Sequence, residues 1–267
     1  MNRRFGAAVI ACALAGAGVA LGQYLEAVVP TGDSPGELVW SRVWNKVYCS
    51  NTQDASITVI SGESSQVLTT IQIGDYPGYL CLNSDESKLY CTRTNDENRL
   101  VIIDVGADTI LKTLSIPNRP GPMAFSATMA KLYISCSDDP VYRIVVLDAR
   151  ADTVLQYIPV LGVGSLLWHP VTNRIFCYTV WNEDTVKVVD CLTDQVVNRT
   201  PLRTADGLYS WCHNPVSDLV YLAAYRAVFA LTPTGDSVAA IIPGGGMTCA
   251  QYHCRTMSTV RATESSA

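Results

Sequence analysis

Residues 88–120 read KLYCTRTNDENRLVIIDVGADTILKTLSIPNRP, with three short apolar runs, at 89–91, 100–104 and 109–116, followed by a turn that contains proline. Apolar and β-branched runs bounded by Asn, Asp, Gly and Pro are typical of β-strands. Segments with the same order of runs and turns begin at Lys46, Lys131, Arg174 and Asp218. The chain therefore repeats one supersecondary unit.

An aromatic residue marks the same point of each unit. These marker residues are Tyr48, Tyr90, Tyr133, Phe176 and Tyr221, and their spacings are 42, 43, 43 and 45 residues. A repeat of about 40–45 residues with four short strands has the size of one β-propeller blade. We therefore predict an all-β fold, a β-propeller of four-stranded antiparallel blades, with about five complete blades.

Each unit supplies strands A to D, counted outward from the propeller axis. Strand B carries the marker, strand A is the run before it, and strand C is the β-branched run that often ends in aspartate. The expected A strands are residues 37–41, 79–82, 123–126, 165–168 and 208–212; the C strands are 57–60, 100–104, 144–148, 186–190 and 228–231; the D strands are 67–73, 110–116, 154–160, 195–200 and 237–242.

Two further strands flank the five units, a lone D-like strand at residues 24–29 and a lone A-like strand at 247–252. The blade that they would share lacks strands B and C, so the pattern predicts an incomplete ring. An open ring exposes the apolar flanks of its first and last blades. We therefore expect either that the coding sequence was cut short or shifted in frame near Cys254 or that two chains associate through their open ends.

The order of motifs resembles a known family. Runs ending in aspartate at 101–104 (VIID), 145–148 (VVLD) and 187–190 (KVVD) combine with Thr109 and Thr153 and with the turns Gly32/Pro35 and Gly74/Pro77. Over about residues 24–247 the sequence resembles the YVTN-type β-propeller repeat, a WD40-like unit of secreted and surface-layer proteins of bacteria and archaea. It departs from that repeat at residues 231–232 and in the turns at 116–117 and 162–163. The resemblance implies the fold and a location outside the cytoplasm, but no particular reaction.

The first residues have the layout of a secretory signal peptide. Arg3 and Arg4 precede an apolar run from residue 5 to 21, and Ala20 and Gly22 fit a cleavage site. The alternative is a membrane anchor, but the run falls short of the roughly 20 strongly apolar residues of a span. We predict a signal peptide at residues 1–22, a propeller domain at 23–255 and a disordered tail at 256–267. The protein would be secreted, periplasmic or on the cell surface, with no stable membrane span after cleavage.

The charge balance disfavours nucleic acid as a partner. The chain has 19 Lys and Arg against 24 Asp and Glu, a net charge of −5, and no basic cluster. Nucleic-acid binding needs clustered Lys and Arg to replace the counterions of the phosphates.

The cysteines favour core packing over a disulfide framework. Of ten, Cys12 lies in the signal peptide, and the remaining odd number cannot pair fully within one chain. Cys49, Cys91 and Cys177 each follow a marker residue, a repeated position typical of a small buried side chain. We expect mostly free thiols. If one pair forms, Cys81–Cys91 is the expected one because both flank the same hairpin turn.

Three histidines, His169, His213 and His253, lie at the ends of successive A strands and could converge as metal ligands. Turn packing is the favoured interpretation, since His169 and His213 open A-to-B turns that contain proline. Acidic B-to-C loops could hold calcium, but none has the alternating spacing of a dedicated calcium loop. We predict no cofactor and no metal.

Two further features bear on function. Trp40 and Trp168 each lie eight residues before a marker, a register that favours inter-blade core over a sugar-stacking platform. No nucleophile motif is present. We predict a non-catalytic scaffold that presents one loop face to a protein or glycan, with binding residues Asp33, Asp75, Tyr76, Arg119, Asp139, Trp181 and Asp206. The alternative is a propeller enzyme, such as a lactonase-like hydrolase or quinoprotein-like dehydrogenase, which needs polar or metal-ligating groups at the axis.

Overall fold

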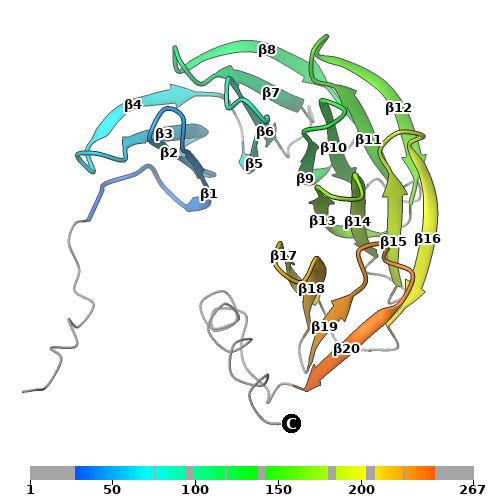
Figure 1. The fold of residues 1–267 in the computed structure, drawn as a ribbon. Helices are drawn as coiled ribbons and strands as arrows, with labels where there is room; N and C mark the ends of the chain where they lie inside the picture. Colours follow the sequence, from blue (N-terminus) through cyan, green and yellow to red (C-terminus); the bar gives the residue numbers. More distant parts are fainter. Residues whose placement is uncertain are drawn as a thin grey trace, which may run out of the picture.

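The computed structural model describes residues 28–74, 76–93, 99–117, 119–137, 142–160, 162–179, 185–202, 208–224 and 227–243. These residues form five antiparallel four-stranded sheets and no helix. The sheets are the blades of a propeller and follow one another along an arc (Figure 1). The arc is open between the first and last blades, where β1 (Pro35–Ser41) and β17 (Leu208–Asn214) lie apart.

The strands follow the chain in order within every blade. Blade 1 holds β1, β2 (Lys46–Asn51), β3 (Ser56–Ser61) and β4 (Val67–Gln72); blade 2 holds β5 (Pro77–Leu82), β6 (Lys88–Arg93), β7 (Arg99–Asp104) and β8 (Thr109–Ser115); blade 3 holds β9 (Pro120–Ser126), β10 (Lys131–Cys136), β11 (Arg143–Asp148) and β12 (Thr153–Pro159); blade 4 holds β13 (Val163–His169), β14 (Arg174–Thr179), β15 (Thr185–Asp190) and β16 (Gln195–Pro201); blade 5 holds β17, β18 (Leu219–Ala224), β19 (Ala227–Leu231) and β20 (Val238–Pro243).

The predicted A to D strands of the five units are all present, and four A strands begin earlier than expected, at Pro35, Pro77, Pro120 and Val163. The extra residues form a bulge against strand B, seen as a register shift between Pro77 and Leu80. The hydroxyl of Thr92 accepts a hydrogen bond from the Tyr79 N–H at 3.0 Å and so satisfies a bulge amide. A bulge of this kind lengthens and twists the strand that carries it.

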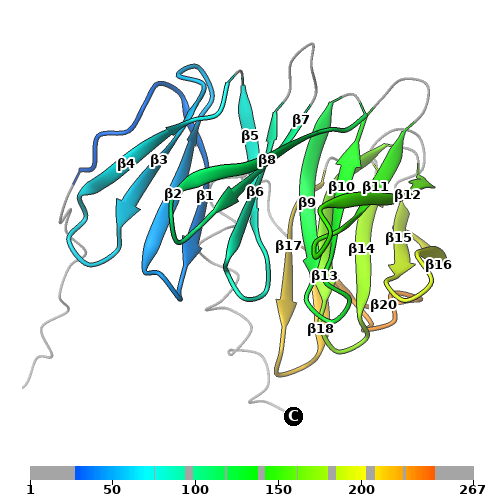
Figure 2. The same cartoon turned by 90° about the horizontal axis from the view of Figure 1, so that it is seen from above.

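The hydrophobic core lies between the blades, which stand side by side in Figure 2. Tyr90 packs toward blade 3, whereas its neighbours Leu89 and Cys91 pack toward blade 1. Because successive side chains of a strand point to opposite faces, each central strand serves two interfaces. This explains why the B and C strands are almost continuously apolar.

None of the seven cysteines in the described part of the chain forms a disulfide. The expected pair Cys81–Cys91 is excluded, because Cys81 lies opposite Tyr90 and packs toward blade 3, while Cys91 packs toward blade 1. Thiols on opposite faces of one blade cannot meet. Core packing explains these cysteines, as expected.

The open arc changes the environment of the first blade. Leu80 and Leu166 are each 8% exposed between neighbouring blades, but Leu38, at the same register of blade 1, is 62% exposed. Trp168 packs in the core between blades 3 and 4, whereas Trp40 at the matching position is 56% exposed. The expectation of an inter-blade core therefore holds for Trp168 and is wrong for Trp40, because no described blade precedes blade 1.

Several expectations fall outside the described residues: the signal peptide at 1–22, most of the strand at 24–29, the strand at 247–252 and the tail at 256–267. Val28 and Val29 are described and are not in a strand. No stretch of the described chain forms a helix that is long and apolar enough to cross a membrane.

Candidate functional sites

One face of the arc carries the D-to-A turns and the B-to-C loops, and we call it the loop face. In blade 1 the Gln53 N–H donates to the carbonyl oxygen of Asp33 at 3.3 Å, and the Asp33 N–H donates to the Asp54 carboxylate at 2.6 Å. In blade 3 the Ser137 N–H donates to the carbonyl oxygen of Arg119 at 3.2 Å. The two sets of loops therefore meet on one face, as expected.

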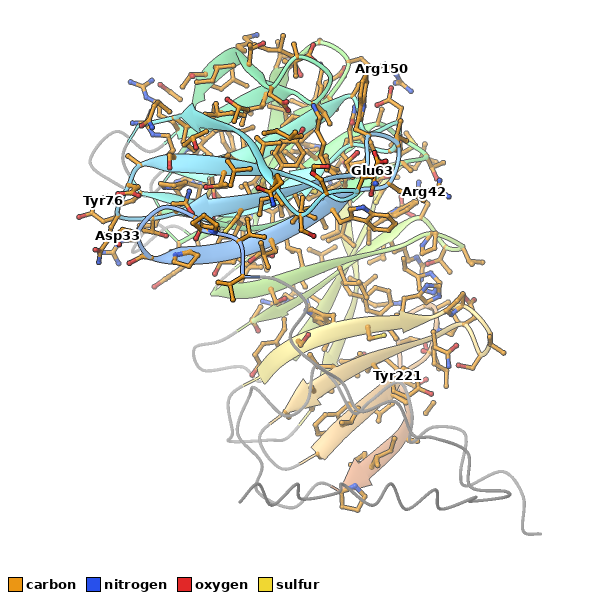
Figure 3. The ribbon with its side chains drawn as sticks, turned by 90° about the vertical axis from the view of Figure 1, so that its left-hand side faces the viewer. Asp33, Arg42, Glu63, Tyr76, Arg150 and Tyr221 are labelled. Carbon is orange, nitrogen blue, oxygen red and sulfur yellow. The ribbon has the colours of Figure 1, made fainter. Side chains whose placement is uncertain are left out.

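Figure 3 separates the two faces of the arc. Asp33 and Tyr76 lie on the loop-face side, whereas Arg42, Glu63 and Arg150 lie on the opposite side. We call this opposite side, which carries the A-to-B and C-to-D turns, the turn face.

Two predicted binding residues of the loop face have an unusual backbone. Tyr76 has φ of 43° and Arg119 has φ of 51°, while Gly162 occupies the same turn before blade 4 with φ of 61°. Left-handed backbone costs a residue with a side chain about 1–2 kcal/mol relative to glycine. The Tyr76 side chain is 53% exposed, and its hydroxyl makes no hydrogen bond to any described residue. Asp75, Asp139, Trp181 and Asp206 lie outside the described residues.

The first three blade junctions share an ion-pair clamp near the turn face. Its lysine comes two residues before the marker aromatic, and its aspartate lies in the C-to-D turn of the next blade. The pairs are Lys46–Asp108 at 2.7 Å, Lys88–Asp152 at 2.7 Å and Lys131–Asp194 at 2.6 Å. Each lysine also donates to a backbone carbonyl of that turn, so the charge is satisfied in a partly buried place.

The junction between blades 4 and 5 lacks this clamp. Arg174 stands in the lysine position and donates to the carbonyl oxygen of Thr234 at 3.0 Å. Phe176 replaces the marker tyrosine and packs against Gly235, whose Cβ, if present, would lie 2.7 Å from the ring. Asp236 turns instead toward the hydroxyls of Thr232 and Ser237. The partly buried ion pair of the first three junctions is therefore replaced by an apolar contact.

A second, smaller contact between blades recurs at the A-to-B turns, and we call it the clasp. Between blades 3 and 4, the side-chain oxygen of Asn173 accepts hydrogen bonds from the Ser126 hydroxyl at 2.8 Å and from the Trp168 ring nitrogen at 3.2 Å. The Ser126 hydroxyl also accepts the Met129 N–H, three residues on, at 3.3 Å. The Ser126 hydroxyl thus hydrogen-bonds both within its own turn and to the next blade.

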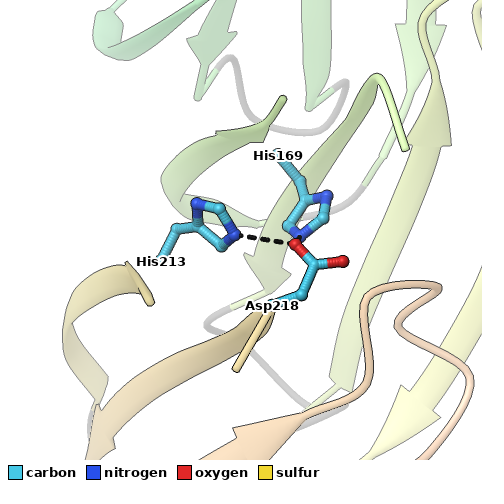
Figure 4. Close-up of side chains that lie close together, drawn as sticks. All are labelled: His169, His213 and Asp218. Carbon is cyan, nitrogen blue, oxygen red and sulfur yellow. Dashed lines mark hydrogen bonds and ion pairs between the residues drawn. The ribbon is translucent and has the colours of Figure 1, made fainter. Parts of the chain in front are cut away.

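In the clasp between blades 4 and 5 all three positions change chemical type. His169 replaces the serine, His213 replaces the tryptophan and Asp218 replaces the asparagine. His169 Nε2 and His213 Nε2 lie 3.2 and 3.1 Å from the same oxygen, Asp218 Oδ1 (Figure 4). The two imidazole centroids are 4.5 Å apart at 69°. The structure therefore brings together two of the three histidines, while His253 lies outside the described residues.

Burial and contacts define the state of His169. Its side chain is fully buried, and burial, together with the nearby His213, lowers its pKa below the usual value. The neutral imidazole is thus favoured. Its Nδ1 lies 3.2 Å from the Thr172 backbone nitrogen and 2.9 Å from the Thr172 hydroxyl oxygen. The histidine therefore does cap its turn, as the sequence suggested, but its other nitrogen faces blade 5.

Sequence reasoning missed Asp218. The signal was available, because Asp218 and Asn173 both lie three residues before a marker residue, as Asn45 does. These three residues share a left-handed backbone in the A-to-B turn, with φ of 57°, 49° and 48°. Asn and Asp tolerate that backbone better than other residues with side chains. Turn formation is therefore sufficient to explain an aspartate at this position, and the sequence pattern does not indicate its contact with the histidines.

Comparisons with known proteins support the fold. Scans against protein-family models and against curated proteins find no match, so the YVTN family remains a resemblance. Among solved structures, the chain is similar to a chain of Kuenenia stuttgartiensis hydrazine synthase, with a TM-score of 0.72 and 16% identity, over 83% of this chain and 70% of that one. In all, 1409 chains of solved structures match. An architecture this common does not specify an activity.

Proposed function

We propose that this chain is an exported, non-catalytic propeller scaffold that binds a protein or glycan partner through its loop face. The observation that supports this most is the left-handed backbone of Tyr76 and Arg119. Gly162 shows that the same turn accepts glycine, yet blades 2 and 3 keep large side chains there at a conformational cost. Strain retained at an exposed loop supports a role in recognition rather than in folding.

The clamps and clasps also support a scaffold. The lysines of the first three junctions donate to the aspartate carboxylates and to backbone carbonyls, so these charges serve blade packing. Export rests on the pattern of residues 1–22. The likeness to hydrazine synthase does not favour an enzyme, because at 16% identity it shows the fold alone.

Glycine substitution tests the loop face without disturbing the fold. The variant Tyr76→Gly/Arg119→Gly copies Gly162, so its unfolding free energy should not fall by more than about 1 kcal/mol. Capture of partners from cell-envelope extracts and binding to a glycan array should both be compared with the unmodified protein. The proposal predicts that at least one ligand is bound by the unmodified protein and lost in the variant.

The matched control changes the turn face. Leu192 and Val171 are 71% and 70% exposed there. The variant Leu192→Ser/Val171→Ser should bind the same ligand unchanged. Equal capture by the glycine variant, or loss of capture in the turn-face control alone, would refute the proposed face. N-terminal sequencing of the exported protein should find Gln23 first; an uncleaved leader would contradict export by a signal peptide.

A further inference from the structure

We infer that His169, His213 and Asp218 bind a divalent transition metal ion, of the zinc type, that joins blade 4 to blade 5. The inference concerns the turn face and does not depend on the loop face or its partner. The clasp between blades 4 and 5 differs in all three side chains from the clasp between blades 3 and 4. Ser126, Trp168 and Asn173 form a complete neutral hydrogen-bond set, and the equivalent positions of the next junction all carry metal-ligating side chains.

The histidines meet because they lie at adjacent registers. His169 pairs across the sheet with Arg174 at the last position of β13, whereas His213 pairs with Val220 one position before the end of β17. Adjacent positions of a strand point to opposite faces of a blade. His169 therefore faces blade 5, His213 faces blade 4, and the two rings converge between the blades.

The donor set fits one ion. The candidate ligand atoms of the three residues lie within 4.8 Å of one another. Ligand atoms held at about 2.0–2.2 Å in a tetrahedral zinc site lie roughly 3.3–3.6 Å apart. The measured separations of 3.1 and 3.2 Å from each Nε2 to Asp218 Oδ1 are close to this spacing. Imidazole and carboxylate ligands together suit zinc and its neighbours better than calcium or magnesium.

The buried nitrogen of His169 supports a ligand more directly. Nε2 is buried and, despite its 3.2 Å separation from Asp218, makes no hydrogen bond of acceptable geometry. An unsatisfied buried polar atom costs about 1–3 kcal/mol. In the preceding clasp the Ser126 hydroxyl at this position is fully engaged. A metal ion between the three side chains would satisfy the nitrogen.

Thr172 supplies the outer contact that a metal-bound histidine needs. Its hydroxyl lies 2.9 Å from His169 Nδ1 and 3.2 Å from the carbonyl oxygen of Pro233. When the hydroxyl donates to Pro233 it can accept a hydrogen bond from Nδ1–H, which leaves the Nε2 lone pair for the ion. Without metal, the Thr172 N–H lies 3.2 Å from Nδ1 and favours the tautomer with its proton on Nε2. Metal loading would therefore exchange this hydrogen bond for a coordination bond at Nε2.

The location explains what the ion would do. This junction lacks the Lys–Asp clamp, and Arg174 donates there to a carbonyl oxygen instead of a carboxylate. The side chain of Asp218 is 33% exposed and that of His213 13% exposed, so water can complete the coordination from the turn face. An ion joining β13, β17 and the turn before β18 would replace the missing ion pair as a cross-link between the blades.

The test uses the full exported chain, stripped with a chelator and then titrated with Zn²⁺ or Co²⁺. We expect one ion per chain by elemental analysis, a visible spectrum of tetrahedral Co²⁺, and a melting temperature that rises on loading and falls again with chelator. Thr172→Val should weaken the affinity by roughly 10- to 100-fold while the Co²⁺ spectrum stays tetrahedral.

The control copies the preceding clasp. In the variant His169→Ser/His213→Trp/Asp218→Asn, the new side chains should form the same hydrogen bonds that Ser126, Trp168 and Asn173 form in the preceding clasp. This variant should fold, bind no ion and melt at the same temperature with or without Zn²⁺. If that variant fails to fold, Asp218→Asn alone should lower the affinity at least tenfold and retain the fold. Absence of stoichiometric binding by the unmodified chain, or equal binding by the folded triple variant, overturns the inference and leaves a metal-free hydrogen-bonded clasp.

Discussion

At the residue scale, three tyrosines at one register of the repeat differ in a single hydrogen bond. The hydroxyls of Tyr48 and Tyr133 donate to Asp108 at 2.8 Å and to Asp194 at 2.6 Å. Lys88 contacts both oxygens of Asp152, at 2.8 and 2.7 Å, and the buried hydroxyl of Tyr90 has no partner. The same side chain is therefore a satisfied donor in two blades and an unsatisfied one in the third.

Phenylalanine substitution should separate these cases. Tyr133→Phe removes a hydrogen bond to a charged group and should lower the unfolding free energy by about 1.5–3 kcal/mol. Tyr90→Phe removes an unsatisfied hydroxyl, so we expect a change of less than about 0.5 kcal/mol or a gain of up to about 1 kcal/mol. Urea unfolding with unchanged m-values measures both. Equal losses in the two variants would show that Tyr90 has a partner in solution.

The sequence predicts the candidate metal site only in part. It placed His169 and His213 at the ends of successive A strands, but it treated them as equivalent. A shift of one residue reverses the face of a strand from which a side chain projects. That shift lets the two rings meet between blades 4 and 5, and it is visible only when each histidine is counted back from its own marker, Phe176 or Tyr221.

At the element scale, the C-to-D turn of blade 5 departs most from the repeat. Gly235 has φ of 68°, and a Cβ there would lie 2.4 Å from Val188 and 2.7 Å from Phe176. Phe176 itself is fully buried. The loss of the tyrosine hydroxyl in strand B and the presence of glycine in the facing turn are therefore two parts of one packing solution.

Gly235→Ala should lower the unfolding free energy by about 2–4 kcal/mol, because left-handed strain adds to overpacking. Gly106→Ala is the matched control. Its Cβ would meet the Trp44 ring at 3.0 Å and the Asp104 carboxylate at 3.3 Å, and Trp44 is 46% exposed and can move. We expect a loss below about 1 kcal/mol there. Thermal and urea unfolding compare the two; a Gly235→Ala variant as stable as the control would contradict the packing of this turn.

Strand identity was predictable, and strand boundaries were less so. The β-branched C strands and the marker aromatics fixed the order of the elements, because a period of two and a repeat of about 43 residues leave few alternatives. The A strands begin earlier because a bulge lengthens them, and in the first two blades a hydroxyl from strand B satisfies a bulge amide, Ser50 for Glu37 and Thr92 for Tyr79. Such a partner comes from another strand and is not read from the local pattern.

At the scale of the whole molecule, the described blades form an open arc whose first blade exposes apolar side chains. Leu38 and Trp40 are 62% and 56% exposed at registers that are packed in the other blades. An exposed apolar sheet face favours association. The repeat predicted the open arc, but it could not predict which surface would cover these side chains.

We expect a second copy of the chain to cover this face. Light scattering at rising concentration should then show a doubling of mass, and Trp40→Arg should keep the protein monomeric by placing a charge on the contact. Trp168→Phe is the control, since Trp168 already packs between blades 3 and 4. A monomer at every concentration, with Trp40 fluorescence quenched freely by iodide, would exclude self-association through this face.

The buried thiols give the whole fold a dependence on alkaline pH. Cys91 and Cys177 are fully buried, and burial raises the pKa of each thiol to about 12, from 9.0. Burial likewise raises the pKa of Tyr133 above its usual value of 10.0. The unfolded chain releases these protons first, so stability should be constant with respect to these groups below pH 9 and should fall above it. Each thiol contributes about 1.4 kcal/mol per pH unit between its two pKa values.

Urea unfolding free energies measured between pH 7 and about pH 10.5 test this linkage. Cys177→Ala should be less stable at neutral pH, because it leaves a small cavity, but its free energy should fall less steeply above pH 9 by one proton equivalent. Val188→Ala also shortens a fully buried core side chain but removes no thiol. Its unfolding free energy should therefore fall with pH as steeply as that of the unmodified protein. A slope that is the same in all three proteins would mean that the thiol of Cys177 ionises in the folded state as readily as in the unfolded chain, and that the core between blades 3 and 4 admits water.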